Sequence, residues 1–265
     1  MLIASIHLAA ARGFGDHAWK LAVFVTTYLY REVQWRKWTD VLIVALDLTR
    51  SLGNPEAEAR VYRILGTAYA RLRAFDEAQE MQTEALRLFR QLGDINSEAH
   101  TLLMLSRNYN WHGDYPAALE RSAEALALYR SIDHPGQARA MIDLGRSHAH
   151  LREHADALEL AQQALSLCQA SSDRDGECSA WALLGDVHFG AGSFIEAISA
   201  YEHALALWRS IGDQIQEAET LVRLADSFQA SGNTASAETA RCDARKLLEK
   251  IGLPQDAQQH LRWNS

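Results

Sequence analysis

The sequence repeats itself about every forty residues, and this periodicity constrains the possible folds more than any other feature. Segments such as EALRLFRQLGD and HALALWRSIGD recur, and each is followed by a short polar loop and a second apolar segment. A repeat of this length predicts similar structural units that stack on their neighbours. Three columns of mostly small residues carry the register: Ala85, Ala125, Ala164, Ala204 and Ala244; Ala78, Ala118, Ala157, Ala197 and Ala237; and Gly66, Ser106, Gly145, Gly185 and Ala225.

Each unit has the pattern of two helices joined by a turn. In one unit, apolar residues recur with helical spacing over 179–190 (helix A) and 194–211 (helix B), on either side of Gly192 and Ser193. Alanine, leucine, glutamate and arginine dominate, and only four prolines interrupt them, which favours helix. We therefore predict an all-α fold, a right-handed superhelical solenoid of antiparallel helix hairpins. We expect a single array over 1–265 with about six hairpins, at 17–52, 56–92, 96–132, 135–171, 175–211 and 215–251, and a closing, capping helix at 255–263.

The two ends of the array differ from its middle. Trp38 stands where the other units have alanine, and Trp35 fills an aromatic slot, so we expect the first hairpin to pack at a different angle. Pro254 is expected to stop the array. Hairpins at the ends of an array expose apolar surface, which makes them candidates for a homodimer contact.

One unit carries a recognisable signature. Trp181, Leu184, Gly185 and His188, followed by Ala197, Tyr201 and Ala204, resemble the tetratricopeptide repeat pattern. Two further features narrow this resemblance to one group within the family. The units are near forty residues long instead of about 34, and the hairpins are joined by the loops Leu52-Gly53-Asn54, Leu92-Gly93-Asp94 and Ile211-Gly212-Asp213. They are similar to the C-terminal tetratricopeptide sensor domains of bacterial antibiotic-regulatory and NB-ARC-type transcriptional regulators.

The resemblance implies a non-catalytic protein- or peptide-binding module with a regulatory role. Because the chain has no G-x-x-x-x-G-K-[ST] loop, its own nucleotide-binding domain would lie outside this sequence and could itself be a partner. Two alternatives stay open. One is a stand-alone peptide receptor of the quorum-sensing type, and the other is a scaffold or accessory protein for an enzyme.

The net charge and the hydropathy of the chain limit the kinds of partner that we expect it to bind. A net charge of -8 argues against direct nucleic-acid binding, because phosphate contacts need a positive surface. The apolar stretch 21–30 is too short to cross a membrane. Residues 1–8 carry no lysine or arginine, which the start of a signal peptide would need, so we expect a cytoplasmic protein. The three cysteines show no metal-ligand spacing.

The concave surface of such an array is lined by helix A, so helix-A positions predict the binding groove. Most of them are cationic in the first units, whereas Asp186, Glu219 and Asp226 make the later units negative. We predict that the groove binds a partner with an acidic segment or a free C-terminal carboxylate. Alternatively, the arginines pair with Glu58, Glu98 or Asp143 and only keep the face solvated. The predicted groove residues are Arg60, Arg63, Arg71, His100, Arg107, Asn110, Trp111, Arg139, Arg146 and His150.

Other clusters of reactive residues predict no chemistry. His148, His150 and His154, with Glu153, fall on different helix faces or in a turn, so we expect no metal there. Cys168 and Ser106 lack a loop that would stabilise an oxyanion. Asp173 and Asp175 follow a repeat loop, where capping of the next helix explains them. We predict no cofactor and no catalytic site.

Overall fold

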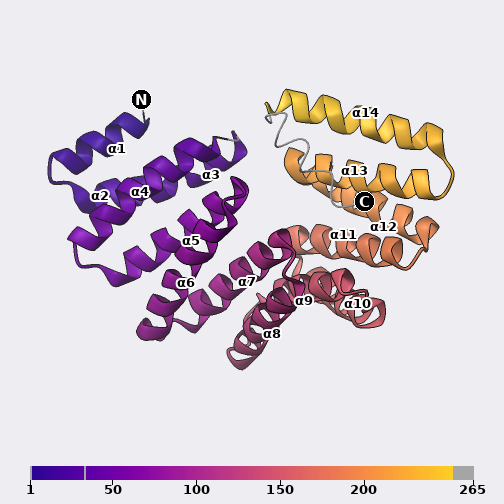
Figure 1. The fold of residues 1–265 in the computed structure, drawn as a ribbon, viewed down its shortest axis with the longest axis horizontal. Coiled ribbons are helices and arrows are strands. Elements are labelled where there is room, and N and C mark those ends of the chain that lie inside the picture. The colour runs from indigo at the N-terminus through magenta and orange to yellow at the C-terminus, as the bar shows by residue number, and fades with distance from the viewer. Residues whose placement is uncertain (1, 33, 253–265) are drawn as a thin grey trace. The chain divides into compact units, whose positions relative to one another are not determined.

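The computed structural model describes residues 2–32 and 34–252, and the regular elements within them are fourteen α-helices (Figure 1). The chain divides into two compact units, Met1–His134 and Pro135–Ser265. The closing helix expected at 255–263 lies outside the described residues, and so does Pro254. No helix in the described part of the chain is long and apolar enough to cross a membrane.

The N-terminal unit begins irregularly and then becomes a stack of hairpins. In the expected first hairpin, 17–52, two short helices, α2 and α3, precede the long α4, and α1 comes before them. Trp38 is buried on α4 in the core of this unit. The later pairs α5 with α6 and α7 with α8 are regular hairpins. The helices are α1 (Leu2–Ala11), α2 (Gly15–Phe24), α3 (Thr26–Arg31), α4 (Trp35–Ser51), α5 (Pro55–Arg71), α6 (Phe75–Leu92), α7 (Ile95–His112) and α8 (Tyr115–Ser131).

The described residues of the C-terminal unit, 135–252, form three hairpins, each packed on the next. Figure 1 shows α13 and α14 side by side, as in every regular hairpin of the chain. The predicted all-α, tetratricopeptide-like hairpin fold is therefore confirmed, whereas a single array over 1–265 stays a prediction. The helices are α9 (Gln137–His150), α10 (His154–Ser171), α11 (Arg174–Gly190), α12 (Phe194–Ile211), α13 (Gln214–Ala230) and α14 (Thr234–Lys250).

Small residues mark the places where helix A touches helix B. A Cβ on Gly185 would lie 2.4 Å from Cε1 of Tyr201, and a Cβ on Gly66 would lie 2.5 Å from Cγ of Gln82. Ser106, in the same column, donates a 2.8 Å hydrogen bond to the carbonyl of Ala118. Larger residues in this column would force the two helices of a hairpin apart.

The loops between hairpins cap the helix that follows. The side chains of Asn54, Asp94, Asp173 and Asp213 each accept a hydrogen bond from a backbone N–H in the first turn of the next helix. The predicted capping role of Asp173 is thus confirmed, with 3.0 Å to the N–H of Gly176. Caps of this kind stabilise a helix by about 1 kcal/mol each.

A repeated ion pair connects helix B to the next helix A at three of the junctions between hairpins. Arg90 donates to Glu98 at 2.8 Å, and Arg209 donates to Glu217 at 2.8 Å. Arg50 pairs with Glu58 at 3.3 Å in the same relative position. Glu58 and Glu98 are therefore held by arginines of helix B, and not by the predicted groove arginines of helix A.

Candidate partner-binding surface

Arg63 of α5 is a half-buried arginine that rests on an aromatic ring. Its guanidinium carbon lies 5.6 Å from the centre of the Phe89 ring, and Nη1 lies 2.9 Å from Nδ1 of His100 on α7. Burial lowers the pKa of Arg63, and the charge of Arg60 adds to this effect. An arginine remains protonated at neutral pH, so Nδ1 of His100 must accept this hydrogen bond and the ring must be neutral.

Arg71, at the end of α5, lies between two aromatic side chains. Its guanidinium carbon is 5.2 Å from the ring centre of Tyr30 on α3 and also 5.2 Å from that of Trp111 on α7. Its Nη2 donates a 3.1 Å hydrogen bond to the Tyr30 hydroxyl. Trp38 contacts the edge of Tyr30 and extends the aromatic cluster into the core.

Within the part of the chain that the structure describes, neither Arg63 nor Arg71 forms an ion pair with a carboxylate. The Nε–H of Arg71 is buried and has no hydrogen-bond acceptor among the same residues. Aromatic faces and neutral acceptors offset part of the cost of desolvating a guanidinium, but they do not neutralise its charge. The described residues of the N-terminal unit thus present two half-buried cations that form no ion pair with a carboxylate, although the charge of Asp94 acts on Arg63 from farther away.

The other predicted groove residues of this unit have more varied surroundings. Arg60 is exposed and pairs with Glu56 at 2.7 Å, as a solvated helix face would. Asn110 is buried, so it lies in the interior and not on the surface. Arg107 is half-buried on α7. The structure therefore brings together Arg63 with His100 and Arg71 with Trp111. Arg60 lies close enough for its charge to act on Arg63, but it pairs with Glu56 on its own helix.

In the C-terminal unit, the predicted groove residues lie on α9. Arg146 reaches the buried carboxylate of Asp143 at 3.5 Å, which is the pairing that the solvated-face alternative predicts. Arg139 is half-buried, and His150 is exposed. Because Arg146 has its own carboxylate, it differs from Arg63 and Arg71.

Two of the three acidic residues predicted for the later helices, Asp186 and Asp226, form ion pairs. Asp186 accepts a 2.7 Å hydrogen bond from the hydroxyl of Tyr201 and pairs with Arg223 at 3.3 Å. Asp226 pairs with Arg241 at 3.5 Å. These pairs connect residues up to 37 positions apart, so inspection of one helix at a time could not reveal them.

The contacts of the residues considered for catalysis or metal binding are those of structural residues. Burial raises the pKa of the Cys168 thiol to about 11, so it stays protonated at neutral pH, and the Ser106 hydroxyl is used in a buried hydrogen bond. His148 lies 2.6 Å from Glu153, and Asp156 lies near both, within 4.8 Å. Both carboxylates are exposed, which suits an ordinary surface contact.

The predicted groove residues do not include Phe89. The sequence does indicate Tyr30 as an aromatic contact in the groove beside Trp111, since Tyr30, Arg71 and Trp111 follow one another at the spacing of the repeat, 41 and 40 residues apart. Phe89 had no such signal, because it belongs to helix B and reaches Arg63 only through the packing of the hairpin.

Solved structures share this fold at low sequence identity. A Rap protein complexed with Competence and Sporulation Factor has a TM-score of 0.76 and 15% identity, covering 98% of this chain and 79% of that one. The Rap conjugation gene regulator of plasmid pLS20, in complex with the Phr* peptide, has a TM-score of 0.73 and 13% identity over 93% and 66% of the two chains.

A third structure has the tetratricopeptide repeat as part of a longer chain. It is a Signal Transduction ATPase with Numerous Domains from Pyrococcus horikoshii, with a tetratricopeptide repeat sensor. Its TM-score is 0.60 at 14% identity, and the match covers 98% of this chain and 45% of that one. At such identities the three likenesses show the fold alone.

Sequence comparison identifies the family directly. No similar sequence was found among the curated proteins. The tetratricopeptide repeat family model matches residues 97–170 and 177–250, more than half of the chain. Together with the small-residue columns and the hairpins described above, this match shows that the chain belongs to the tetratricopeptide repeat family.

Proposed function

We propose that this tetratricopeptide module is non-catalytic and binds an acidic segment, or a free C-terminal carboxylate, of a protein or peptide partner on its N-terminal unit. One observation carries the proposal: Arg63 and Arg71, both half-buried on α5, form no ion pair with a carboxylate among the described residues. A partner's carboxylate would supply the missing counter-charge.

The energetic argument favours a carboxylate over a neutral group. Burial has already removed part of the water around the Arg63 guanidinium. A carboxylate would replace this lost water with a strong hydrogen-bond acceptor of opposite charge. Hydrogen bonds to charged groups contribute about 1.5–3 kcal/mol each. Tyr30 and Trp111 hold the Arg71 guanidinium in place, which lowers the entropy that binding must overcome.

The biological setting that we propose is the sensory, regulatory array of a bacterial transcriptional regulator in the cytoplasm. The likeness to the tetratricopeptide repeat sensor of the Pyrococcus horikoshii ATPase supports this setting. The partner would then be a protein, including a nucleotide-binding domain that belongs to the same regulator.

A peptide receptor is the second candidate function. Two of the similar structures are Rap proteins that hold Competence and Sporulation Factor or the Phr* peptide. A receptor would bind a free short peptide by itself, whereas a regulatory array would bind an acidic segment within a folded partner. Peptide length and the state of the C terminus therefore distinguish the two.

Binding can be measured by fluorescence anisotropy with labelled octapeptide pools. One pool carries Asp and Glu at alternate positions, and the matched pool carries Asn and Gln, each with a free or an amidated C terminus. We expect the native chain to prefer the acidic pool. The double variant Arg63→Gln, Arg71→Gln should lose at least about tenfold in affinity, which corresponds to 1.4 kcal/mol.

The matched control is Arg50→Gln with Arg87→Gln, which removes the same charge from two exposed arginines that already have carboxylate partners and lie outside the predicted groove. It should bind like the native chain. Equal losses in both double variants would mean that net charge, and not the desolvated pair, attracts the peptide. Equal binding of the two pools by the native chain would contradict the proposed function.

We also propose that terminal hairpins support self-association. Phe24 is 81% exposed at the end of α2, and Phe14 and Tyr28 nearby in sequence are 57% exposed each. Light scattering would show a dimer that Phe24→Ser with Tyr28→Ser weakens. A monomer at all concentrations would contradict this proposal.

A further inference from the structure

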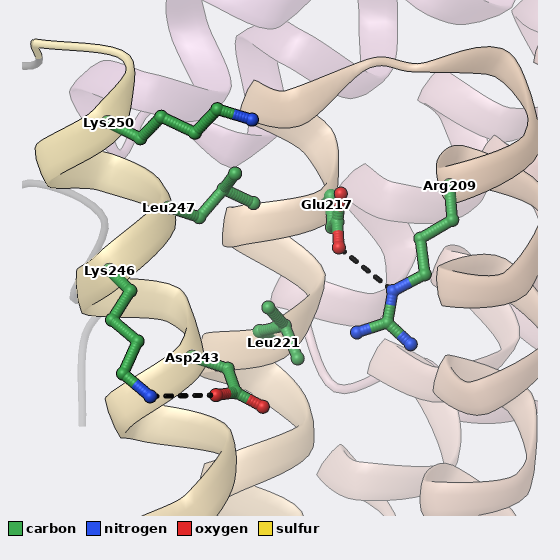
Figure 2. Close-up of a pocket in the computed structure, with 7 residues that line it drawn as sticks. All are labelled: Arg209, Glu217, Leu221, Asp243, Lys246, Leu247 and Lys250. Carbon is green, nitrogen blue, oxygen red and sulfur yellow. Dashed lines mark hydrogen bonds and ion pairs between the residues drawn. The ribbon is translucent and has the colours of Figure 1, made fainter.

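The C-terminal unit has a small groove above α13, between α12 and α14 (Figure 2). Its volume is about 280 Å³. Figure 2 shows Leu247 and Lys250 extending from α14 toward α13 and Arg209 facing them from α12. The lining residues are Arg209, Glu217, Leu221, Asp243, Lys246, Leu247 and Lys250.

Aromatic side chains fill the equivalent place in two other hairpins of the same chain. Tyr62 of α5 is the counterpart of Leu221, and Arg50, the counterpart of Arg209, lies over its ring at 5.3 Å from the centre. On α11 the counterpart of Leu221 is Trp181, which stacks on His203 at 4.5 Å between ring centres and 16° between planes.

A third hairpin closes the same place with an ion bridge. Above Leu102, Arg90 donates to Glu98 at 2.8 Å and to Glu124 of the following helix B at 2.5 Å. In three hairpins this position of the repeat is therefore filled or covered, in two by an aromatic ring and in one by a bridging arginine.

The last hairpin has the components for neither closure. Leu221 is smaller than tyrosine or tryptophan, so it leaves the space above α13 empty. Asp243, the counterpart of Glu124, is one methylene shorter and pairs with Lys246 on its own helix at 3.8 Å. Arg209 pairs with Glu217 at 2.8 Å. Among the residues that the structure describes, no side chain closes this groove.

We propose that this groove binds an aromatic side chain of a partner protein, at a position flanked by acidic residues. An incoming ring would take the place that Tyr62 and Trp181 fill elsewhere, with Leu221 and Leu247 below it and the Arg209 guanidinium against its face. The volume lies just below the roughly 300–1,000 Å³ of small-molecule sites. It suits one side chain.

The charges of the rim favour acidic neighbours of that ring. Three cations, Arg209, Lys246 and Lys250, surround the groove, against two carboxylates, Glu217 and Asp243. Both carboxylates are already paired, whereas the ammonium of Lys250 is exposed beside the leucine floor. This site belongs to the C-terminal unit and is independent of the carboxylate-binding arginines on α5.

The test uses two synthetic peptides, acetyl-Glu-Tyr-Glu-amide and acetyl-Glu-Ala-Glu-amide, titrated into the full chain. Methyl NMR of ¹³C-labelled leucines reports on Leu221 and Leu247. We expect the tyrosine peptide to shift both sets of methyl signals, with an affinity in the millimolar range and at least about tenfold above that of the alanine peptide. Arg63→Gln with Arg71→Gln should leave this binding unchanged.

Two variants connect the binding to the groove. Leu221→Trp restores the aromatic residue of α11 and should remove binding of the tyrosine peptide. Arg209→Gln changes an exposed side chain, so the chain should fold normally, and the tyrosine peptide should bind several-fold more weakly. Equal shifts from both peptides, no shift from the tyrosine peptide, or unchanged binding by Arg209→Gln would overturn the proposal.

Discussion

The hydroxyl of Tyr201 donates a 2.7 Å hydrogen bond to Oδ1 of Asp186, while Arg223 holds the other carboxylate oxygen at 3.3 Å. The three residues come from α12, α11 and α13, so they connect two neighbouring hairpins. Burial, together with the charge of Asp186, raises the pKa of Tyr201 well above its ordinary value. The phenol therefore remains a donor over the whole physiological range.

Asp186→Asn should destabilise the C-terminal unit. The change leaves Arg223 without its carboxylate, and both side chains are about one-fifth exposed, so we expect a loss of about 2 kcal/mol rather than the 3–5 of a fully buried pair. Urea unfolding followed by circular dichroism measures it. Asp226→Asn, whose partner Arg241 is more exposed, should cost less than about 1 kcal/mol. Equal losses of unfolding free energy in the two variants would contradict the prediction that the Asp186–Arg223 pair stabilises the fold more than the Asp226–Arg241 pair.

Gly185→Ala should destabilise the fold although alanine is the better helix former. The new Cβ would lie 2.4 Å from the buried ring of Tyr201, which cannot move without displacing α12. Overpacking of about 1–3 kcal/mol should exceed the helix-propensity gain of about 1 kcal/mol. At Gly145 the nearest atom is the methyl Cδ2 of Leu183 at 2.9 Å, so Gly145→Ala should cost less. Thermal unfolding of the two variants would show which substitution lowers the stability more.

Two buried thiols should make the fold sensitive to alkaline pH. Burial raises the pKa of Cys168 to about 11 and that of Cys178 to about 12, from 9.0. Between pH 9 and pH 11 the unfolded chain has lost these protons and the folded chain has kept them. The free energy of unfolding should therefore fall as pH rises, by on the order of 1 kcal/mol per thiol.

Urea unfolding at intervals between pH 8.5 and pH 10.5 checks this dependence. Cys168→Ala with Cys178→Ala should give a flatter pH profile than the native chain, whatever its absolute stability. Cys242→Ala, at a half-buried position, controls for the loss of a thiol. A native profile as flat as that of the double variant would refute the prediction.

The ion bridge of Arg90 should contribute modestly and depend on salt. Its side chain is 45% exposed, so Arg90→Gln should lower the free energy of unfolding by less than about 1 kcal/mol despite two close carboxylates. Most of the difference should disappear in 1 M sodium chloride, where screening acts over about 3 Å. A difference that persists at high salt would indicate packing of the side chain and not charge.

Much of the fold could be predicted from the sequence, because the same helix–helix contact recurs in every repeat and requires the same kind of residue at the same position. Only small residues permit the close approach of helix A and helix B, so the columns through Gly185 and Ala197 predict where hairpins form. The first hairpin was harder to predict. Its helix A is divided into α2 and α3, and tertiary packing around Trp38 replaces the repeat pattern there.

The helices, the hairpin repeat and the family follow from the sequence alone, because they depend on local propensity and on periodic small residues. Which charged residues of different hairpins form ion pairs depends on how the hairpins pack. Arg223 is paired with Asp186, whereas Arg63 and Arg71 rest on aromatic rings. The physical reason is that partners such as Arg223 and Asp186 lie one repeat apart in sequence and meet only when neighbouring hairpins pack against each other.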